Sequence, residues 1–161
     1  MRQIGNYPII EIPNPLLETV SSPIEKIEEY KEALLELLKS CNENKTFLGV
    51  SLIQIGIPKR AFIGKIGKNF EPEIIINPEI MWKSKLLQIS LKDGEQCLSV
   101  PKKSVKILRS YLIRVRYLDV NGKTVKRTLR GMQSIVFQHE FDHLNGVLIT
   151  HKEKQLVLVR S

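Results

Sequence analysis

Apolar residues recur at helical spacing in the first third of the chain. Ser22-Pro23-Ile24-Glu25 places serine at a helix cap, proline at the first helical position and glutamate three residues after the cap. Apolar side chains then follow every three or four residues, with Glu and Lys between them: Ile27, Tyr30, Leu34, Leu37, Leu38 and Cys41. We predict an amphipathic helix that begins at Ser22 and buries Cys41 in the core.

A second helix is predicted from near Gly131 to about Leu144. Asn145-Gly146 follows as a suitable C-terminal stop. The apolar side of this helix consists of Met132, Ile135, Val136 and Leu144. That side should bury the helix against the rest of the protein.

Short β-branched runs bounded by Gly or Pro predict strands at residues 61–66, 73–77, 86–91 and 112–117. The Asn-Gly pair at 121–122 predicts a tight hairpin that joins residues 111–119 to 124–129. Residues 155–159 are expected to form a closing strand. We predict an α+β fold in one domain, residues 1–161, with mostly antiparallel sheets around a central helix, an N-terminal helix and a C-terminal strand.

Composition indicates an ordinary globular protein, since 42% of the 161 residues are hydrophobic and 26% are charged. No apolar run approaches the length that spans a membrane, and the N-terminus has no signal-peptide core. We therefore expect a cytoplasmic protein, with an organelle interior as the alternative, and a monomer by default. In that setting Cys41 and Cys97 would stay reduced.

The net charge of +8 is concentrated in a basic stretch, residues 102–130, where ten Lys or Arg residues face one acid, Asp119. We interpret these charges as the solvated faces of antiparallel strands. Binding to nucleic acid or to the ribosome is the alternative, although no nucleic-acid-binding module accompanies the stretch.

The sharpest chemical signal is Gln-His-Glu-Phe-Asp-His at residues 138–143. Histidines four apart on a helix turn through about 400°, so His139 and His143 project from one face toward a single ion. Glu140 is rotated to flank that ion, which suits a base or acid that acts on water at a metal. The alternative is a surface helix that carries two histidines by chance.

A catalytic metal site usually has three protein ligands, and Cys97 is the candidate for the third. It lies between the turn-forming residues Gly94 and Pro101, in a segment that we expect to be irregular. His151 is the competing ligand, but it follows the helix stop closely and is more typical of a surface histidine.

Three stretches resemble the signature motifs of the peptide deformylase family and occur in the family's order. They are residues 47–56 (Phe-Leu-Gly-Val-Ser-Leu-Ile-Gln-Ile-Gly), 95–99 (Glu-Gln-Cys-Leu-Ser) and 139–146 (His-Glu-Phe-Asp-His-Leu-Asn-Gly). The resemblance implies a metal-dependent hydrolase that removes the N-formyl group from formyl-methionine at the start of nascent polypeptides. It also implies one divalent ion held by Cys97, His139 and His143. That ion is usually Fe²⁺, with Zn²⁺, Ni²⁺ or Co²⁺ as alternatives.

Further roles follow from the same resemblance. Glu140 matches the general base and acid, while the Gln54 amide and the Leu98 backbone N–H match the donors to the oxyanion. Gly49 matches the backbone that binds the formyl end of the substrate, and the main chain of Gln96 can still hydrogen-bond a peptide. By position, the apolar pocket for the methionine side chain would be lined by Leu48, Met132, Ile135 and Val136, for which simple core packing is the alternative.

The chain departs from the family pattern around these residues. Phe47 and Gln96 stand where the family usually has glycine, and Ser51 and Leu52 replace small residues. If residue 96 required a positive φ, glutamine there would be unfavourable. We predict a divergent, active deformylase. One alternative is a metal-binding paralogue with altered or lost activity, and another is a ribosome- or nucleic-acid-binding module in which the metal is structural.

Overall fold

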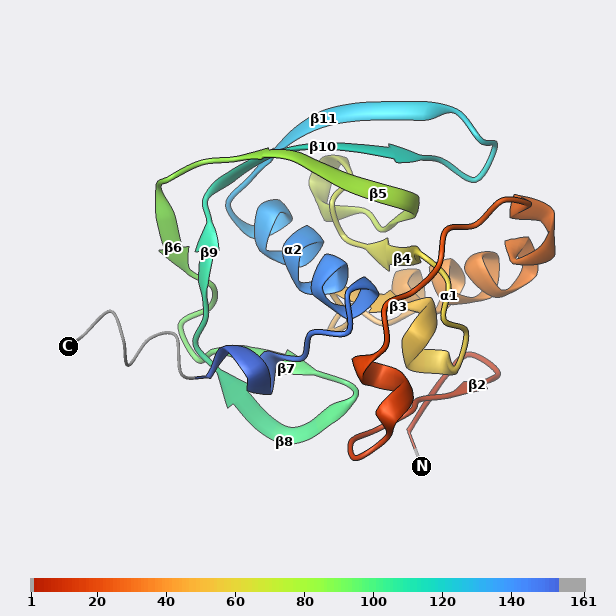
Figure 1. The fold of residues 1–161 in the computed structure, drawn as a ribbon, viewed down its shortest axis with the longest axis horizontal. Helices are drawn as coiled ribbons and strands as arrows, with labels where there is room; N and C mark the ends of the chain where they lie inside the picture. Colours follow the sequence, from red (N-terminus) through yellow and green to blue (C-terminus); the bar gives the residue numbers. More distant parts are fainter. Residues whose placement is uncertain (1, 154–161) are drawn as a thin grey trace.

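The computed structural model describes residues 2–153, and within them two α-helices lie on opposite faces of a five-stranded sheet (Figure 1). The helices are α1 (Lys31–Glu43) and α2 (Met132–Leu144). Neighbouring strands are antiparallel throughout the sheet. In spatial order its strands are β11 (Thr124–Arg130), β10 (Leu112–Leu118), β5 (Glu73–Lys83), β4 (Ala61–Gly64) and β3 (Gly49–Ser51).

Shorter elements surround this centre. Three two-stranded antiparallel sheets pair β1 (Gln3–Ile4) with β2 (Tyr7–Pro8), β6 (Leu87–Ile89) with β9 (Leu108–Ser110), and β7 (Glu95–Cys97) with β8 (Val100–Val105). The described 3₁₀ helices are η1 (Pro15–Glu18), η2 (Ile27–Glu29), η3 (Leu52–Ile55), η4 (Lys68–Phe70) and η5 (Ile149–Lys152). The mixture confirms the predicted α+β fold class.

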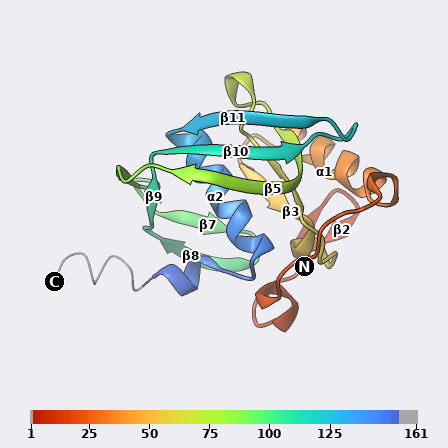
Figure 2. The ribbon, with the colours of Figure 1, turned by 45° about the horizontal axis from the view of Figure 1, so that its top comes forward.

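The sheet is covered on both faces at β4 but on only one at β10. Alternate side chains of a strand point to opposite faces. Phe62 of β4 packs with Phe137 of α2, while Ile63 belongs to the cluster that contains Leu34 of α1. Every residue of β4 is therefore buried. On β10 the buried residues Ile113, Val115 and Tyr117 belong to the cluster that contains Phe137 of α2, whereas Arg114 and Arg116 point to the opposite face. Figure 2 shows β5, β10 and β11 lying across α2.

Helix α2 lies at the centre of the molecule, where it contacts β3, β4, β9 and β11. It begins after Gly131, whose φ is 56°, and ends at Asn145, followed by Gly146 with φ of 70°. Positive φ at the residue after a helix is the conformation that glycine adopts most easily. The predicted bounds and the central position of this helix are confirmed.

The predicted start of the first helix at Ser22 is wrong. The Ser22 amide donates to the carbonyl of Pro58 at 3.1 Å, and the amide and carbonyl of Ile24 both bond the side chain of Asn77 at 2.8 Å. These long-range bonds hold the segment extended, so the α-helix begins only at Lys31, after the turn η2. Cys41 is fully buried on α1, as predicted, and burial raises the pKa of its thiol to about 12.

Among the other predictions, the hairpin is confirmed and the irregular segment around Cys97 is wrong. The Asn-Gly hairpin joins β10 to β11 as expected, and Gly122 there has φ of 79°. Cys97 belongs to the strand β7 and not to an irregular segment. The closing strand predicted at 155–159 lies outside the described residues. Within those residues, no helix is long and apolar enough to cross a membrane.

Candidate metal centre and active site

Cys97, His139 and His143 converge at one point of the structure. A ligand atom of each lies within 4.8 Å of the other two, and the Cys97 Sγ is 3.3 Å from the His143 Nε2. The histidines are one helical turn apart on α2, with ring centroids 5.2 Å apart. The cysteine comes from β7 and belongs to a small apolar cluster that also contains Val100 of β8 and, in the segment after α2, Leu148 and Ile149. Helical spacing and sheet packing thus bring together one thiol and two imidazoles.

A buried ion-pair network fixes the orientation of His139. Its Nδ1 lies 2.7 Å from Glu95 Oε2, and Arg109 donates two hydrogen bonds of 2.8 Å to the Glu95 carboxylate. Arg109 also donates to Asp142 on α2. Burial acts to raise the pKa of Glu95, but the hydrogen bonds from Arg109 and His139 bring it to about 2. With Nδ1 engaged by a carboxylate, the His139 Nε2 is the nitrogen available to an ion.

Arg109 corrects one expectation from the sequence. The charge pattern predicts that Arg109, with the rest of the basic stretch, lies on a solvated strand face, but it is only 2% exposed and joins β9 to β7 and α2. Glu95 and Asp142 belong to two of the motifs, but no sequence pattern gave them a role, and none placed Arg109 in the site. The one available signal was a charged residue that directly follows the apolar pair Ile107-Leu108.

The three candidate ligands fit a divalent metal ion. Burial raises the pKa of the Cys97 thiol, but the charges and hydrogen bonds of His143 and His139 lower it well below its ordinary value. A metal-binding cysteine must be deprotonated, which this environment favours. Among the described residues the His143 Nδ1 has no hydrogen-bond partner, and this cluster is the one group of such side chains close enough to share an ion. His151 is exposed and does not join it.

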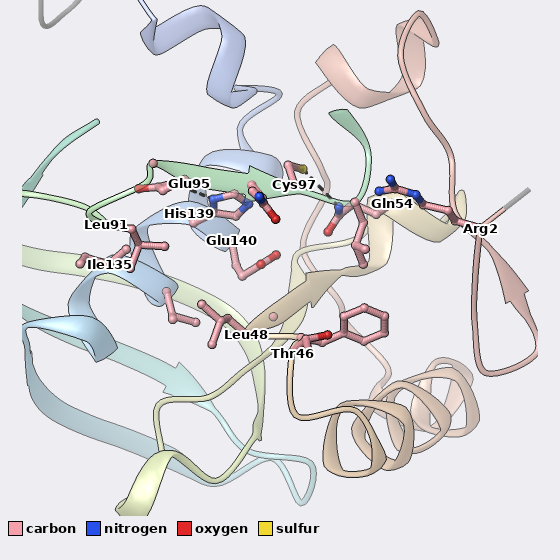
Figure 3. Close-up of a pocket in the computed structure, with 16 residues that line it drawn as sticks. Arg2, Thr46, Leu48, Gln54, Leu91, Glu95, Cys97, Ile135, His139 and Glu140 are labelled. Atoms are coloured by element: carbon pink, nitrogen blue, oxygen red, sulfur yellow. Dashed lines mark hydrogen bonds and ion pairs between the residues drawn. The ribbon is translucent and has the colours of Figure 1, made fainter. Parts of the chain in front are cut away.

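Cys97 and His139 of this cluster line a cavity of about 290 Å³ (Figure 3). His143 is buried and is not among the lining residues in the described part of the chain. In the figure Leu91 and Ile135 lie at one end of the cavity and Arg2 at the other, with Cys97, His139 and Glu140 between them. The predicted site residues that line it are Leu48, Gly49, Gln54, Gln96, Cys97, Leu98, Ile135, Val136, His139 and Glu140. Met132 is not part of this lining as far as residues 2–153 show it, and packs instead with the core cluster around Phe137. Arg2, Thr46 and Leu91 are lining residues that no sequence pattern indicated.

Glu140 is buried beside the cluster and touches strand β3. Its Oε2 accepts a hydrogen bond of 2.6 Å from the Ser51 hydroxyl. Burial raises the pKa of this carboxyl, although the neighbouring imidazoles act to lower it. A Cβ added at Gly49 would stand 2.6 Å from the Glu140 Oε1, so the glycine leaves the space that this carboxylate occupies.

Gln54 presents its amide nitrogen to the cluster. Its Oε1 accepts from the Ser51 backbone N–H at 2.9 Å, which turns Nε2 toward Ser99 Oγ at 3.0 Å and Cys97 Sγ at 3.7 Å. Gln96 is exposed on β7, and it is not one of the residues with positive φ. Glutamine at this position therefore carries no backbone strain.

Comparison with known proteins decides the family. A sequence model described as polypeptide deformylase matches residues 6–157. The chain belongs to the polypeptide deformylase family. Among the relatives of this deformylase, the peptide deformylase of Thermotoga neapolitana is 38% identical over 88% of this chain and 83% of that protein. The peptide deformylase of Phenylobacterium zucineum is 34% identical over 87% of this chain and 83% of that protein.

Solved structures show the same likeness in three dimensions. Peptide deformylase from Thermotoga maritima matches this deformylase with a TM-score of 0.82 and 35% identity, over 91% of this chain and 96% of the other. An actinonin-bound class I type b peptide deformylase from Acinetobacter baumannii matches with a TM-score of 0.79 and 26% identity, over 91% of this chain and 97% of the other. The chain is therefore an enzyme of this family in both sequence and fold.

Proposed function

We propose that this deformylase is a metal-dependent amide hydrolase that removes the N-formyl group from formyl-methionine at the start of newly made polypeptides. The observation that carries the proposal is the meeting of Cys97, His139 and His143 at one point, beside a cavity that Cys97, His139 and Glu140 line. The family supplies the reaction class, and the cavity supplies a place where an amide and a proton carrier can meet.

Cys97, His139 and His143 would hold one divalent ion. We propose Fe²⁺ as the resident metal, with Zn²⁺, Ni²⁺ or Co²⁺ able to replace it, since nitrogen and sulfur ligands suit all four. A bound ion would supply Lewis-acid chemistry, which polarises a carbonyl group and acidifies water. Glu95 and Arg109 would keep the His139 ring in the orientation that binding requires.

Glu140 is the proposed proton carrier. A carboxyl with a raised pKa can take a proton from the attacking water and return it to the leaving amine. The C–N bond of the formamide breaks, and the products are formate and a free amino terminus. Gln54 Nε2 and the Leu98 backbone N–H, both at the cavity, would donate hydrogen bonds to the oxyanion that forms.

The apolar end of the cavity is the proposed pocket for the methionine side chain. Leu48, Ile135, Val136 and Leu91 offer the contacts there. Gly49 and the main chain of Gln96 would bind the peptide backbone. Residue 96 has no positive φ, so the departure from glycine does not favour an inactive paralogue.

We further propose a single catalytic domain, residues 1–161, that acts as a monomer in the cytoplasm on nascent chains. Contact with the ribosome through residues 102–130 would use the outer face of β10 and β11. Arg114 and Arg116 there lie opposite Thr128 and Lys126 in the strand register. Glu79 pairs with Arg116 and reduces the net charge of that face.

Formate release from formyl-Met-Ala-Ser tests the proposed function. Protein would be prepared without oxygen and loaded with Fe²⁺ or Ni²⁺, beside the variants Glu140→Gln and Cys97→Ser. We expect turnover by the unchanged protein. In Glu140→Gln the rate of formate release should fall by about 10²-fold or more, because general acid–base catalysis contributes on that scale. Glu79→Gln, an exposed carboxylate on the outer sheet face, is the matched control and should retain full activity.

Two other outcomes would change the conclusion. Metal binding without turnover would identify a paralogue that has lost the reaction. Full activity in Glu140→Gln would remove Glu140 from the proposed mechanism, whatever the metal content.

A further inference from the structure

Ser51 lies at the end of β3, fully buried, and makes contacts with two of the proposed catalytic side chains. Its hydroxyl donates to Glu140 Oε2 at 2.6 Å, and the same oxygen lies 3.3 Å from the Glu140 carbonyl oxygen. Its backbone N–H donates to Gln54 Oε1 at 2.9 Å. One residue therefore connects the strand that borders the cavity with the carboxyl and the amide that act in it.

The hydroxyl distinguishes the two oxygens of Glu140. A serine hydroxyl has one proton to donate, and the much shorter distance assigns that proton to Oε2. The other oxygen, Oε1, has no hydrogen-bond partner within residues 2–153 and lies against Gly49. A buried hydrogen bond to a carboxylate is stronger than one between neutral groups, so Ser51 holds the side chain in this rotamer.

The backbone contact of Ser51 has a separate effect. It fixes the oxygen of the Gln54 amide, so that the nitrogen points toward Cys97 and Ser99. A substitution at residue 51 would keep this contact, because any residue other than proline retains the backbone N–H. The contribution of the hydroxyl can therefore be separated from that of the main chain.

We propose that Ser51 is a positioning residue, whose hydroxyl holds Glu140 so that Oε1 is the oxygen that exchanges protons with the substrate. This inference rests on the proposed function of Glu140. The proton from the attacking water goes to Oε1 and leaves from Oε1 to the amine, while the proton of Ser51 stays on its own oxygen.

The test compares Ser51→Ala with Ser134→Ala in the metal-loaded enzyme. Ser134 is the matched control because it is equally buried and its hydroxyl donates to the Ser110 carbonyl at 2.7 Å, away from the cavity. For Ser51→Ala we expect kcat with formyl-Met-Ala-Ser to fall about tenfold, a part of what a general acid or base contributes. KM and metal content should stay unchanged, because substrate and metal contacts remain. Ser134→Ala should leave kcat and KM unchanged.

A crystal structure of Ser51→Ala provides a readout that does not depend on turnover. We expect the Glu140 carboxylate to leave its position against β3, while the Gln54 amide stays in place. If Ser51→Ala fails to fold, Ser51→Cys preserves the volume with a much weaker donor and should show the same fall in kcat.

An unchanged kcat in Ser51→Ala, or a Glu140 that stays in place in the crystal, would overturn the proposal. Absence of turnover in the unchanged enzyme would instead refute the proposed function. In that case the crystal structure alone decides whether Ser51 positions Glu140.

Discussion

At Gly49 a missing side chain leaves the space that Glu140 fills. A Cβ there would meet the Glu140 Oε1 at 2.6 Å, closer than real Cβ contacts come, and the φ of Gly49 is not positive. Space, and not backbone conformation, therefore excludes larger residues. We expect Gly49→Ala to displace the carboxylate and lower kcat about 10²-fold, since small misplacements of reacting groups cost on that order. Formate release at saturating substrate would measure this.

Metal content is the control for the Gly49 variant. The three heavy atoms nearest to a Cβ at residue 49 all belong to Glu140, and none belongs to Cys97, His139 or His143. The ratio of metal to protein should therefore equal that of the unchanged enzyme. A Gly49→Ala enzyme with undiminished kcat would show that Glu140 does not need this position.

Between the elements, Arg109 links β9 to β7 and to α2 through buried ion pairs. Arg109→Met keeps an apolar stem but leaves the Glu95 carboxylate buried without its main partner. Removal of one member of a buried pair typically destabilises a protein by about 3–5 kcal/mol. We expect a loss of that size in the free energy of unfolding, measured by urea denaturation.

Arg116→Met is the matched comparison for Arg109→Met. Arg116 pairs with Glu79 on the outer face of the sheet, where both side chains are largely exposed. Exposed pairs contribute about 0–1 kcal/mol, so this variant should unfold nearly as the unchanged protein does. Equal losses in the two variants would contradict the role given to the buried network.

Local patterns predicted some of these elements, and long-range contacts determined the rest. The i, i+4 spacing of His139 and His143 specifies their common face without reference to any other part of the chain. The start of α1 was missed because Asn77, 53 residues along the chain, binds the backbone of Ile24. Arg109 was missed for the same reason, since its partners Glu95 and Asp142 are distant in sequence. Pocket residues on irregular segments, such as Arg2 and Thr46, leave no periodic signal.

For the whole molecule, metal removal should loosen the structure without unfolding it. The metal would link β7 to α2, but three apolar clusters within the described residues hold the elements together independently. Ligand binding to the native state stabilises it by mass action, so a chelator should lower the melting temperature by several degrees. Circular dichroism at room temperature should stay unchanged. Complete unfolding by the chelator would indicate a structural metal instead.

The order in which the proposed ligands are synthesised has a consequence for how a metal ion would enter the site. Cys97 and His143 are 46 residues apart, and the chain grows from the N-terminus, so the cysteine leaves the ribosome well before the second histidine. A single thiol cannot retain an ion selectively, because the site gains its selectivity from the complete ligand set and its geometry. Insertion of an ion at the proposed site would therefore follow translation of residue 143. Every new molecule would pass through a metal-free period, and the local metal supply during that period would determine which ion the site receives.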